Sequence, residues 1–307
     1  MGFPYNGILP LYKPKGMTSH DCVVRVRNIV KMKKIGHTGT LDPDATGVLP
    51  ICLGRATKVA EYMSDYSKTY EAEVTLGVAT STEDSSGEIV EQQELLQPIA
   101  QETLQSVLQS MVGKQTQIPP MYSAVKVNGK RLYEYAFEGK VIDRPSREIF
   151  IENIQLLSNR QVDQTHPTFF IRVACSKGTY IRTLAVDIGK KLGYPAHMSY
   201  LKRMKSGPFT LDSSLTFGEI EDAVNNGMLN EKLYPVETAI KHFEKIVFPE
   251  HLTKKIENGA VLPIIDNSKG NKWAIYNNNG ECLAIYIPHP SKQGYMKPEK
   301  LIKVKDS

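Results

Sequence analysis

The chain has 307 residues, of which 41% are hydrophobic and 23% are charged, and its formal net charge is +5. This length is typical of about two domains and is ample for a sizeable core. No apolar run approaches the ~20 residues that a membrane-spanning helix needs. The first residues also lack the charged-then-apolar order of a secretory signal. We therefore expect a cytoplasmic protein.

The four cysteines lie far apart, each within an apolar run, and the histidines show no pair at metal-ligand spacing. Cysteines in such surroundings are typical of reduced core thiols, so we expect neither disulfides nor a structural metal. Clusters of basic residues favour binding to a polyanion, although solvated faces are the alternative. These clusters are residues 25–34, Lys126 with Lys130 and Arg131, Arg144 with Arg147, and residues 202–205.

In chain order, the first half predicts helices where apolar residues recur at helical spacing and strands where they alternate with polar ones. An N-cap of Ser19 is expected for the first helix. The expected elements are a helix over 19–32, a loop over 36–50, a buried strand over 48–53, a short helix over 56–63, a strand over 69–77, a polar turn over 80–88 and a helix over 101–112.

Residues 118–147 differ from the segments on either side. Prolines bound this stretch, it is rich in Tyr, Lys and Arg, and Asn128-Gly129 marks a tight turn. Interleaved aromatic and cationic residues suit nucleic-acid contact, since rings stack on bases while cations meet phosphates. An ordinary surface hairpin and helix is the alternative.

The second half mixes strands and helices without a βαβ repeat, which predicts an α+β large domain. From Ile246 onward, short apolar runs alternate with turns, which is typical of a small β-rich module. The expected elements are strands over 147–157 and 168–176, a helix that begins after Gly178 and Thr179, a strand over 197–209, helices and linkers within 216–226 and 231–243, a hairpin around Asn279-Gly280 and an apolar run over 301–304.

The loop 36-GHTGTLDPDATGVLP-50 holds Asp42 next to a proline and before a buried strand. Asp before Pro favours turn initiation, so Asp42 could simply cap a turn. A calcium loop is a second interpretation, but position twelve is Leu53 where a bidentate Glu is required. The pattern D-x-D-x-T of residues 42–46 also suggests an aspartate-nucleophile phosphatase. That chemistry needs a preceding apolar strand and later acidic residues, and neither is evident.

A fourth interpretation is a carboxylate that acts as nucleophile or base on a sugar or base without a metal. Such a group needs rigid placement, partial burial and a cation that keeps it ionised. Pro43 stiffens the loop, and Arg182 is a candidate cation because it begins a helix that follows a buried strand.

Several motifs in order resemble bacterial tRNA pseudouridine-55 synthases, the TruB family, over essentially the whole chain. This resemblance excludes the phosphatase and calcium interpretations. The motifs are 13-KPKGMTS-19, 36-GHTGTLDPDATGVLPICLGRATK-58, 68-KTYEAEVTLG-77, 119-PPMYSAVKVNGKRLYEYA-136, 176-SKGTYIRTLAVDIG-189 and 201-LKRMKSGPF-209.

The resemblance implies a pseudouridine synthase core of α+β class, with a mixed, mainly antiparallel sheet flanked by helices. It implies a catalytic domain over 1–243, in which residues 118–147 form a thumb-like RNA-binding insertion. A small β-rich, PUA-like domain is implied over 244–307. The partner would be the T arm of tRNA, with no cofactor, no metal, no membrane and no obligate protein partner. We expect a monomer.

The resemblance also implies roles for single residues. Asp44 receives none, although its charge should tend to raise the pKa of Asp42. The implied roles are Asp42 as catalytic aspartate, Arg182 as its ion-pair partner, Tyr70 as the ring that stacks on the target base, His37 as an RNA contact near the vacated position, Tyr180 and Leu201 as pocket residues, and Lys13 as a substrate-side residue of the motif that supports the catalytic loop.

The implied reaction flips a uridine out of the T arm, breaks its N1–C1′ bond and rejoins the base through C5. Attack of Asp42 on C1′, addition to the base and removal of a sugar proton all remain open. A non-catalytic RNA-binding or RNA-folding module is the competing function. The presence of Asp42, Tyr70 and Arg182 together favours the enzyme.

Overall fold

The computed structural model describes residues 4–160, 166–265 and 270–303. Its large sheet has nine strands within these residues. They are β1 (Gly7–Lys13), β2 (Ile35–His37), β3 (Thr46–Leu53), β4 (Lys68–Leu76), β7 (Gly113–Gln117), β10 (Arg147–Arg160), β11 (Thr168–Cys175), β12 (Ala196–Ser206) and β13 (Phe209–Thr210).

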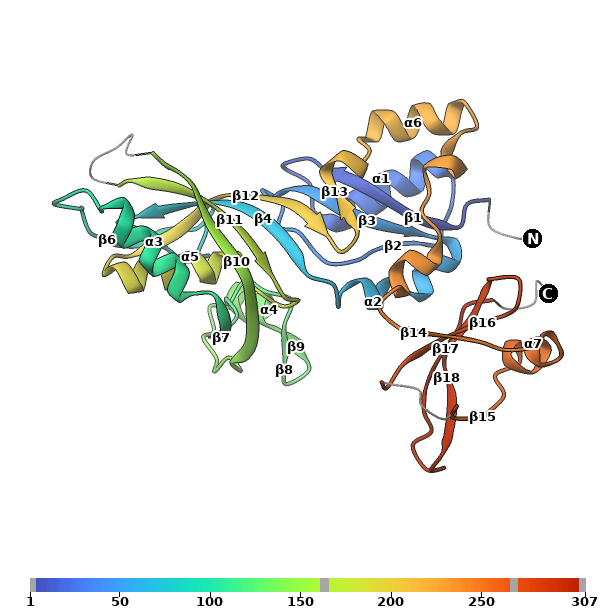
Figure 1. Cartoon of the computed structure of the whole chain (residues 1–307). Helices are drawn as coiled ribbons and strands as arrows, with labels where there is room; N and C mark the ends of the chain where they lie inside the picture. Colours follow the sequence, from blue (N-terminus) through green and yellow to red (C-terminus); the bar gives the residue numbers. More distant parts are fainter. Residues whose placement is uncertain (1–3, 161–165, 266–269, 304–307) are drawn as a thin grey trace.

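Seven of these strands follow the order β1-β3-β12-β4-β11-β10-β7, while β2 pairs with β3 and β13 with β12 (Figure 1). Of the pairs in this sheet, β3 with β12 is parallel and the others are antiparallel. The predicted α+β class with a mixed, mainly antiparallel sheet is therefore confirmed.

Helices cover this sheet in two groups. One group, α3 (Gln101–Ser110) and α5 (Ile181–Leu192), packs beside β10 and β11, and the other, α1 (Ser19–Val30) and α6 (Phe217–Asn225), packs beside β1 and β3 (Figure 1). The shorter helical elements are η1 (Gly54–Lys58), α2 (Ala60–Met63), α4 (Leu132–Phe137), η2 (Leu211–Ser213), η3 (Leu229–Lys232), η4 (Val236–Ile240) and α7 (Glu250–Glu257).

The apolar pattern of each strand follows from what covers it. In β4, alternate residues from Ala72 to Leu76 are buried against the α3 and α5 side, which confirms the predicted strand. In β3, every residue after Thr46 is buried, because α1 and α6 cover one face and η4 covers the other. The sequence of a strand that is covered on both faces is a nearly continuous apolar run. The four cysteines are buried and unpaired, as expected.

The first helix begins at Ser19, so the predicted N-cap of Ser19 is wrong by one residue. Thr18 is the cap: its Oγ1 accepts from the backbone N–H of Asp21, and the Asp21 carboxylate accepts from the backbone N–H of Thr18. The Ser19 hydroxyl instead exchanges hydrogen bonds with the backbone of Leu41. The helix ends at Val30 and not at residue 32, because Lys31 adopts the left-handed conformation with φ of 53°.

Three other boundaries differ from prediction. The helix expected over 56–63 divides into η1 and α2, and the region 231–243 forms only 3-10 turns among its described elements. The strand expected over 197–209 divides into β12 and β13, because Gly207 turns the chain with φ of +57°.

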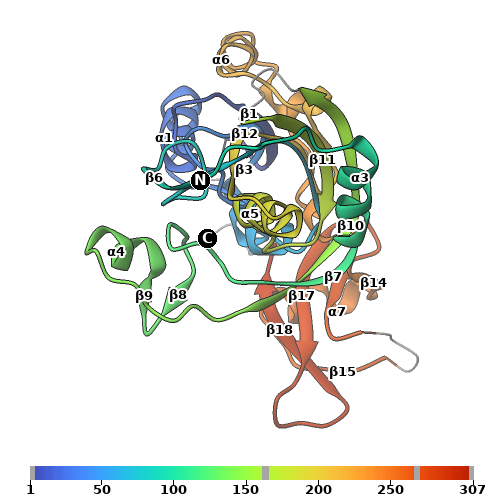
Figure 2. The ribbon, with the colours of Figure 1, turned by 90° about the vertical axis from the view of Figure 1, so that its left-hand side faces the viewer.

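The insertion at residues 118–147, which we call the thumb, projects sideways from the body (Figure 2). It consists of the hairpin β8 (Lys126–Val127) and β9 (Lys130–Arg131) followed by α4. Asn128 and Gly129 join the two strands with positive φ angles of 51° and 82°. This is the two-residue hairpin turn that Asn-Gly favours, and it confirms the predicted turn.

A second, five-stranded sheet starts at Glu244, in the order β14-β16-β17-β18-β15. This module confirms the expected β-rich C-terminal region. Of the segment expected over 301–304, only Leu301 belongs to a strand, which starts at Tyr295; residues 302 and 303 follow that strand, and residue 304 lies outside the described part. The strands are β14 (Glu244–Val247), β15 (Leu262–Pro263), β16 (Trp273–Tyr276), β17 (Cys282–Pro288) and β18 (Tyr295–Leu301), and the remaining pair, β5 (Val78–Thr80) with β6 (Ile89–Gln92), belongs to the large domain.

The C-terminal module packs on η1 and α2 of the large domain. Lys58 donates to the Leu301 carbonyl at 2.7 Å, and the Tyr62 hydroxyl donates to Glu299 at 2.6 Å. Apolar side chains from both parts share one cluster, which includes Val59 and Ile285. In the described part of the chain, no helix is long and apolar enough to cross a membrane.

Candidate active site

Asp42 lies in the loop between β2 and β3, and buried polar groups fix this loop. The ammonium of Lys13 is fully buried and donates to the carbonyls of Pro14 at 2.9 Å, Pro43 at 2.9 Å and Ala45 at 2.6 Å. Burial lowers the pKa of Lys13. On the other side of Asp42, the Ser19 hydroxyl exchanges hydrogen bonds with the backbone of Leu41. Hydrogen bonds therefore fix the loop on both sides of Asp42.

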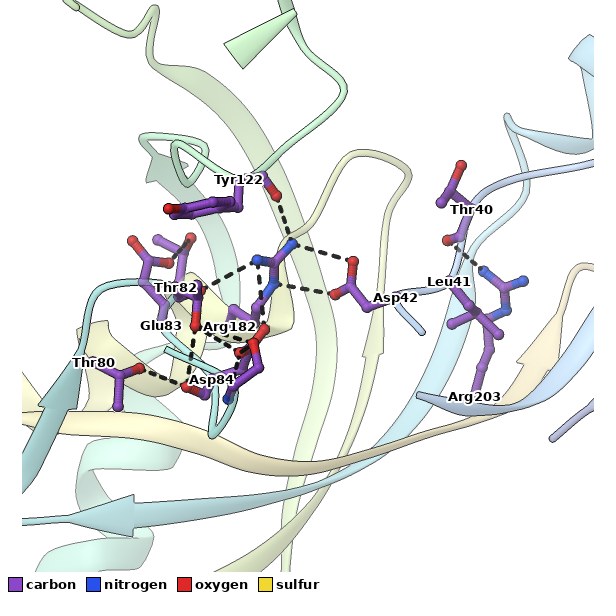
Figure 3. A network of polar contacts seen from close by, with 12 residues as sticks. Thr40, Leu41, Asp42, Thr80, Thr82, Glu83, Asp84, Tyr122, Arg182 and Arg203 are labelled. Carbon is purple, nitrogen blue, oxygen red and sulfur yellow. Dashed lines mark hydrogen bonds and ion pairs between the residues drawn. The ribbon is translucent and has the colours of Figure 1, made fainter. Parts of the chain in front are cut away.

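Asp42 and Arg182 form a two-point ion pair. Arg182 Nε lies 3.1 Å from Asp42 Oδ2, and Arg182 Nη2 donates to Asp42 Oδ1 at 3.3 Å (Figure 3). The arginine side chain is only 7% exposed, whereas the carboxylate is 37% exposed and so remains accessible from the cleft. A planar guanidinium that grips both oxygens fixes the orientation of the carboxylate as well as its charge.

Arg182 is itself held by groups from two other segments. Its Nη1 donates to the Thr82 carbonyl at 3.2 Å and lies 3.6 Å from Asp84 Oδ2, and its Nη2 also donates to the Tyr122 carbonyl at 3.0 Å. Thr82 and Asp84 belong to the predicted polar turn, and Tyr122 belongs to the thumb. Figure 3 shows the guanidinium between these groups and Asp42. Arg182 therefore links the loop of Asp42, the turn and the thumb.

The charge state of Asp42 reflects opposing influences. Burial raises the pKa of Asp42, the Arg182 guanidinium opposes this rise, and the negative charge of Asp84 adds to it. Asp44 also raises the pKa of Asp42, as expected, but its effect is smaller than that of Asp84. The arginine thus moderates the rise in the pKa of Asp42 without cancelling it.

A cleft of about 840 Å³ opens over the ion pair. This volume lies in the range of ligand pockets, ~300–1,000 Å³. The sheet supplies its floor, and the thumb supplies part of one wall through Tyr122 and Tyr133. The predicted site residues that line it together are Asp42, Tyr70, Tyr180, Arg182 and Leu201.

Tyr70, Tyr180 and Leu201 reach the cleft from different elements. Tyr70 lies on β4 and is half-buried, with its ring packed against the core, and burial raises the pKa of its hydroxyl. Leu201 is buried on the neighbouring β12. Tyr180 precedes α5, where its N–H donates to Gln117 Oε1 at 3.0 Å and its carbonyl accepts from Gln117 Nε2 at 3.1 Å. The cleft thus has aromatic and aliphatic side chains around the Asp42 carboxylate.

Of the described residues that were expected in the site, Lys13 and His37 lie outside the lining of this cleft. Lys13 is fully buried on three backbone carbonyls, so we interpret it as a support for the loop and not as a substrate contact. His37 is half-buried at the end of β2. Burial lowers the pKa of His37, which keeps its ring neutral at pH 7.

Asp84, Tyr122 and Ser19 were not expected in the site. Asp84 lies in a segment whose Asp, Ser and Thr residues indicate only a turn, and it does close that turn by accepting from Thr82 Oγ1 at 2.7 Å. Tyr122 acts through its backbone carbonyl, which every residue has. Ser19 was interpreted as a helix cap, a role that its neighbour Thr18 fills.

Two family models match this chain in sequence. The model described as TruB family pseudouridylate synthase (N terminal domain) matches residues 27–181, and that of the tRNA pseudouridylate synthase B C-terminal domain matches residues 182–241. The protein named tRNA pseudouridine synthase B of Bacillus licheniformis is 53% identical over 302 residues, which cover 97% of this chain and 98% of that protein. Its namesake in Bacillus subtilis is 52% identical over 301 residues, covering 97% of each chain.

Solved structures agree with these matches. A chain in the crystal structure of a Cbf5-Nop10-Gar1 complex aligns with a TM-score of 0.75 and 26% identity, covering 99% of this chain and 91% of that chain. A chain in an archaeal box H/ACA sRNP Nop10-Cbf5 complex aligns with a TM-score of 0.72 and 25% identity, covering 98% and 87%. The carboxylate gripped by a buried guanidinium under an aromatic cleft thus occurs in a chain that belongs to the TruB family of pseudouridylate synthases.

Proposed function

We propose that this protein isomerises a uridine in the T arm of tRNA to pseudouridine, with Asp42 as the catalytic aspartate. The observation that carries the proposal is the two-point pair of Asp42 and Arg182 beneath a cleft that Tyr70, Tyr180 and Leu201 line. Family membership makes the chain a pseudouridylate synthase. The names of the similar Bacillus proteins support tRNA as its substrate.

The target uridine must leave the helical stack before its C1′ and C5 can reach Asp42. Flipping a nucleotide costs a few kcal/mol. Stacking of the base on an aromatic ring returns roughly 1–3 kcal/mol, and Tyr70 presents such a ring next to Asp42. His37, whose imidazole is neutral, lies at the edge of the loop and would contact the RNA near the vacated position.

The chemistry breaks the N1–C1′ bond, turns the base and forms a C5–C1′ bond. N1 ends with a proton, and C5 loses one, so the atoms and electrons balance without an oxidant or reductant. Asp42 assists by attack on C1′, by addition to the base or by removal of a sugar proton. In each case the reacting form is the carboxylate, which Arg182 orients and partly stabilises.

The thumb and the C-terminal module would bind the remainder of the RNA. Within residues 118–147, aromatic side chains alternate with Lys and Arg, and Phe137 is 77% exposed. We assign residues 1–243 to the catalytic domain and residues 244–307 to a PUA-like domain, since the second sheet starts at Glu244. We also propose that the protein acts on tRNA as a monomer in the cytoplasm.

The test is incubation of the purified protein with a T-arm stem-loop RNA, followed by mapping of modified uridines at single-nucleotide resolution. We expect one pseudouridine in the loop, and none when that uridine is replaced by cytidine. Binding of the RNA without conversion would favour the alternative of an RNA-binding or RNA-folding module and would contradict the proposal.

Tyr70 offers a test of base stacking. Tyr70→Phe keeps the aromatic ring, so the stem-loop should bind within about 3-fold of wild type. Tyr70→Ala removes the ring and should weaken binding by about 10-fold or more, since a stacked base contributes ~1–3 kcal/mol. Fluorescence anisotropy with a labelled stem-loop would measure both affinities. Equal affinities of the two variants would contradict a stacking role for Tyr70.

The acid limb of the pH profile offers a test of the electrostatics. Activity should fall as the pH drops through the pKa of Asp42, which burial raises above the ordinary value of 3.8. Asp84→Asn removes a charge that contributes to this rise, so the acid limb of kcat/KM should move to lower pH. Asp44→Asn is the matched control and should give a smaller shift, because Asp44 raises the pKa of Asp42 less than Asp84 does. An acid limb that stays in place or moves up in Asp84→Asn would contradict this account.

A further inference from the structure

Arg203 is a buried cation at the junction of three strands. It is only 1% exposed and lies on β12, where its register partners are Gly47 on β3 and Tyr70 on β4. Gly47 follows the catalytic loop, and Tyr70 lines the cleft. The backbone position of Arg203 is therefore tied to both sides of the site.

The guanidinium of Arg203 points toward the segment that precedes Asp42. Its Nε donates to the Val48 carbonyl at 2.7 Å, its Nη1 to the Thr40 carbonyl at 3.4 Å and its Nη2 to the Gly39 carbonyl at 3.3 Å. Figure 3 shows this group beside Thr40 and Leu41, on the side of the loop away from Arg182. Two of its three acceptors thus lie two and three residues before the catalytic aspartate.

Burying a guanidinium costs more free energy than filling the same space with an apolar side chain. Burial of a charge is costly unless its donors are paired, and a well-packed apolar side chain is often as stabilising or more so. The three bonds of Arg203 go to backbone carbonyls that lie on two separate stretches, residues 39–40 and residue 48. An apolar side chain could fill the volume but could not hold these carbonyls in place.

The close approach of β12 to β3 makes this arrangement rigid. A Cβ built at Gly47 would lie 2.2 Å from the Arg203 carbonyl oxygen, and Gly47 has φ of +106°. Only glycine allows the two backbones to be so close. Lys13 holds the carbonyls of Pro43 and Ala45 on the other side of Asp42. Two buried cations therefore bracket the aspartate, one at residues 39–40 and the other at residues 43–45.

We propose that Arg203 is a positioning residue that sets the orientation of the Asp42 carboxylate by fixing the carbonyls of Gly39 and Thr40. This inference rests on the proposed function of Asp42. It assigns Arg203 no contact with RNA, because Arg203 is only 1% exposed although it borders the cleft and belongs to the basic cluster 202–205. Arg203 affects the reaction through the position of the loop. A misplacement of a reacting group by about 1 Å can reduce the rate of an enzyme by about 100-fold.

The test compares Arg203→Lys with the wild type on the stem-loop RNA. Lysine keeps the charge but loses the planar fork, so it cannot bond residues 39–40 and 48 at once. We expect kcat to fall by about 10- to 100-fold, with KM and RNA affinity within about 3-fold of wild type. Arg172→Lys, the same substitution at an arginine on β11 that pairs with Glu71 at the surface, is the matched control and should retain wild-type kcat.

Two readouts separate positioning from a general loss of stability. A loosened loop weakens the pair of Asp42 with Arg182, so the acid limb of kcat/KM should move to higher pH in Arg203→Lys. Hydrogen exchange of the backbone amides over residues 39–45 should also be faster than in wild type, whereas the exchange of β10 and β11 should not change. The exchange readout does not depend on activity, and conversion by the wild type tests the proposed function separately.

A second variant acts on the other side of the same contact. Gly39 has φ of +102°, and a Cβ there would lie 3.9 Å from Arg203 Nη1, so Gly39→Ala strains the carbonyl acceptor without removing the buried cation. It should show the same fall in kcat with RNA binding retained, and it carries the test if Arg203→Lys does not fold. A kcat within about 3-fold of wild type in the folded variants, or unchanged exchange over residues 39–45, would overturn the inference.

Discussion

Asp42→Asn should lower the single-turnover rate on the T-arm stem-loop by on the order of 10⁴-fold or more, the size of loss that follows removal of a central catalytic group. The amide has the shape of the carboxylate but carries no charge, so it can neither attack C1′ nor accept a proton. The amide oxygen of Asn can still accept one hydrogen bond from Arg182, and the other contacts of Arg182 remain. The cleft should therefore keep its form, and RNA affinity should remain within about 3-fold of wild type.

The control for this variant is Asp44→Asn. Asp44 is an exposed carboxylate two residues along the same loop, and the same change there should leave the rate near wild type at neutral pH. Rates would be measured with enzyme in excess over RNA, and affinities by filter binding. Appreciable turnover by Asp42→Asn would show that another group performs the chemistry.

Arg182→Lys should lower kcat by about 10²- to 10³-fold, in line with the loss of an oriented group that stabilises charge at a reacting centre. The arginine binds both oxygens of Asp42 and also donates to the carbonyls of Thr82 and Tyr122. A lysine ammonium is a point charge on a flexible stem, so it cannot satisfy these acceptors in one plane. The carboxylate would then keep a positive neighbour but lose its fixed orientation.

A steady-state kcat and a pH profile would measure the effect of Arg182→Lys. Arg172→Lys provides the control, since the ion pair of Arg172 with Glu71 lies at the surface and the change should have little effect. Near-normal activity of Arg182→Lys would contradict the proposed role of the two-point pair.

Much of the fold follows from local patterns in the sequence. The alternation of Ala72, Val74 and Leu76 predicted β4, and the apolar run over 48–53 predicted a buried β3, which begins two residues earlier, at Thr46. Asn128-Gly129 predicted the hairpin of the thumb. These elements depend on side-chain periodicity and turn chemistry, which neighbouring residues determine. The caps and short helical turns were predicted less well, because competing hydroxyls such as Thr18 and Ser19 lie side by side.

The motif residues of the site were predictable, but their spatial arrangement was not. Asp42 and Arg182 are 140 residues apart, and only the sheet topology brings the β2–β3 loop beside the start of α5. The carbonyl acceptors of Thr82 and Tyr122 have no sequence signature, since every residue carries one. The role of Asp84 was missed for a similar reason, because a turn aspartate that also reaches an arginine looks like any other turn aspartate.

The basic segment 202–205 shows how a cluster in sequence can divide in space. It was interpreted as a polyanion-binding group, but successive strand residues point to opposite faces. Leu201 and Arg203 are buried on one face of β12, and Lys202 between them is partly exposed on the other. Lys205 is exposed because a register shift follows Arg203. The net charge of the segment therefore overstates the charge that is available to RNA, because its most buried cation, Arg203, donates to backbone carbonyls of the loop that holds Asp42.

The most direct test of the proposed mechanism is a crystal structure of Asp42→Asn bound to a T-arm stem-loop with an intact target uridine. We predict that this uridine is flipped into the cleft and stacked on Tyr70, with its C1′ beside the side chain at position 42 and within reach of Arg182. A target uridine that stays in the RNA stack, or a flipped one whose ribose lies away from position 42, would contradict the account.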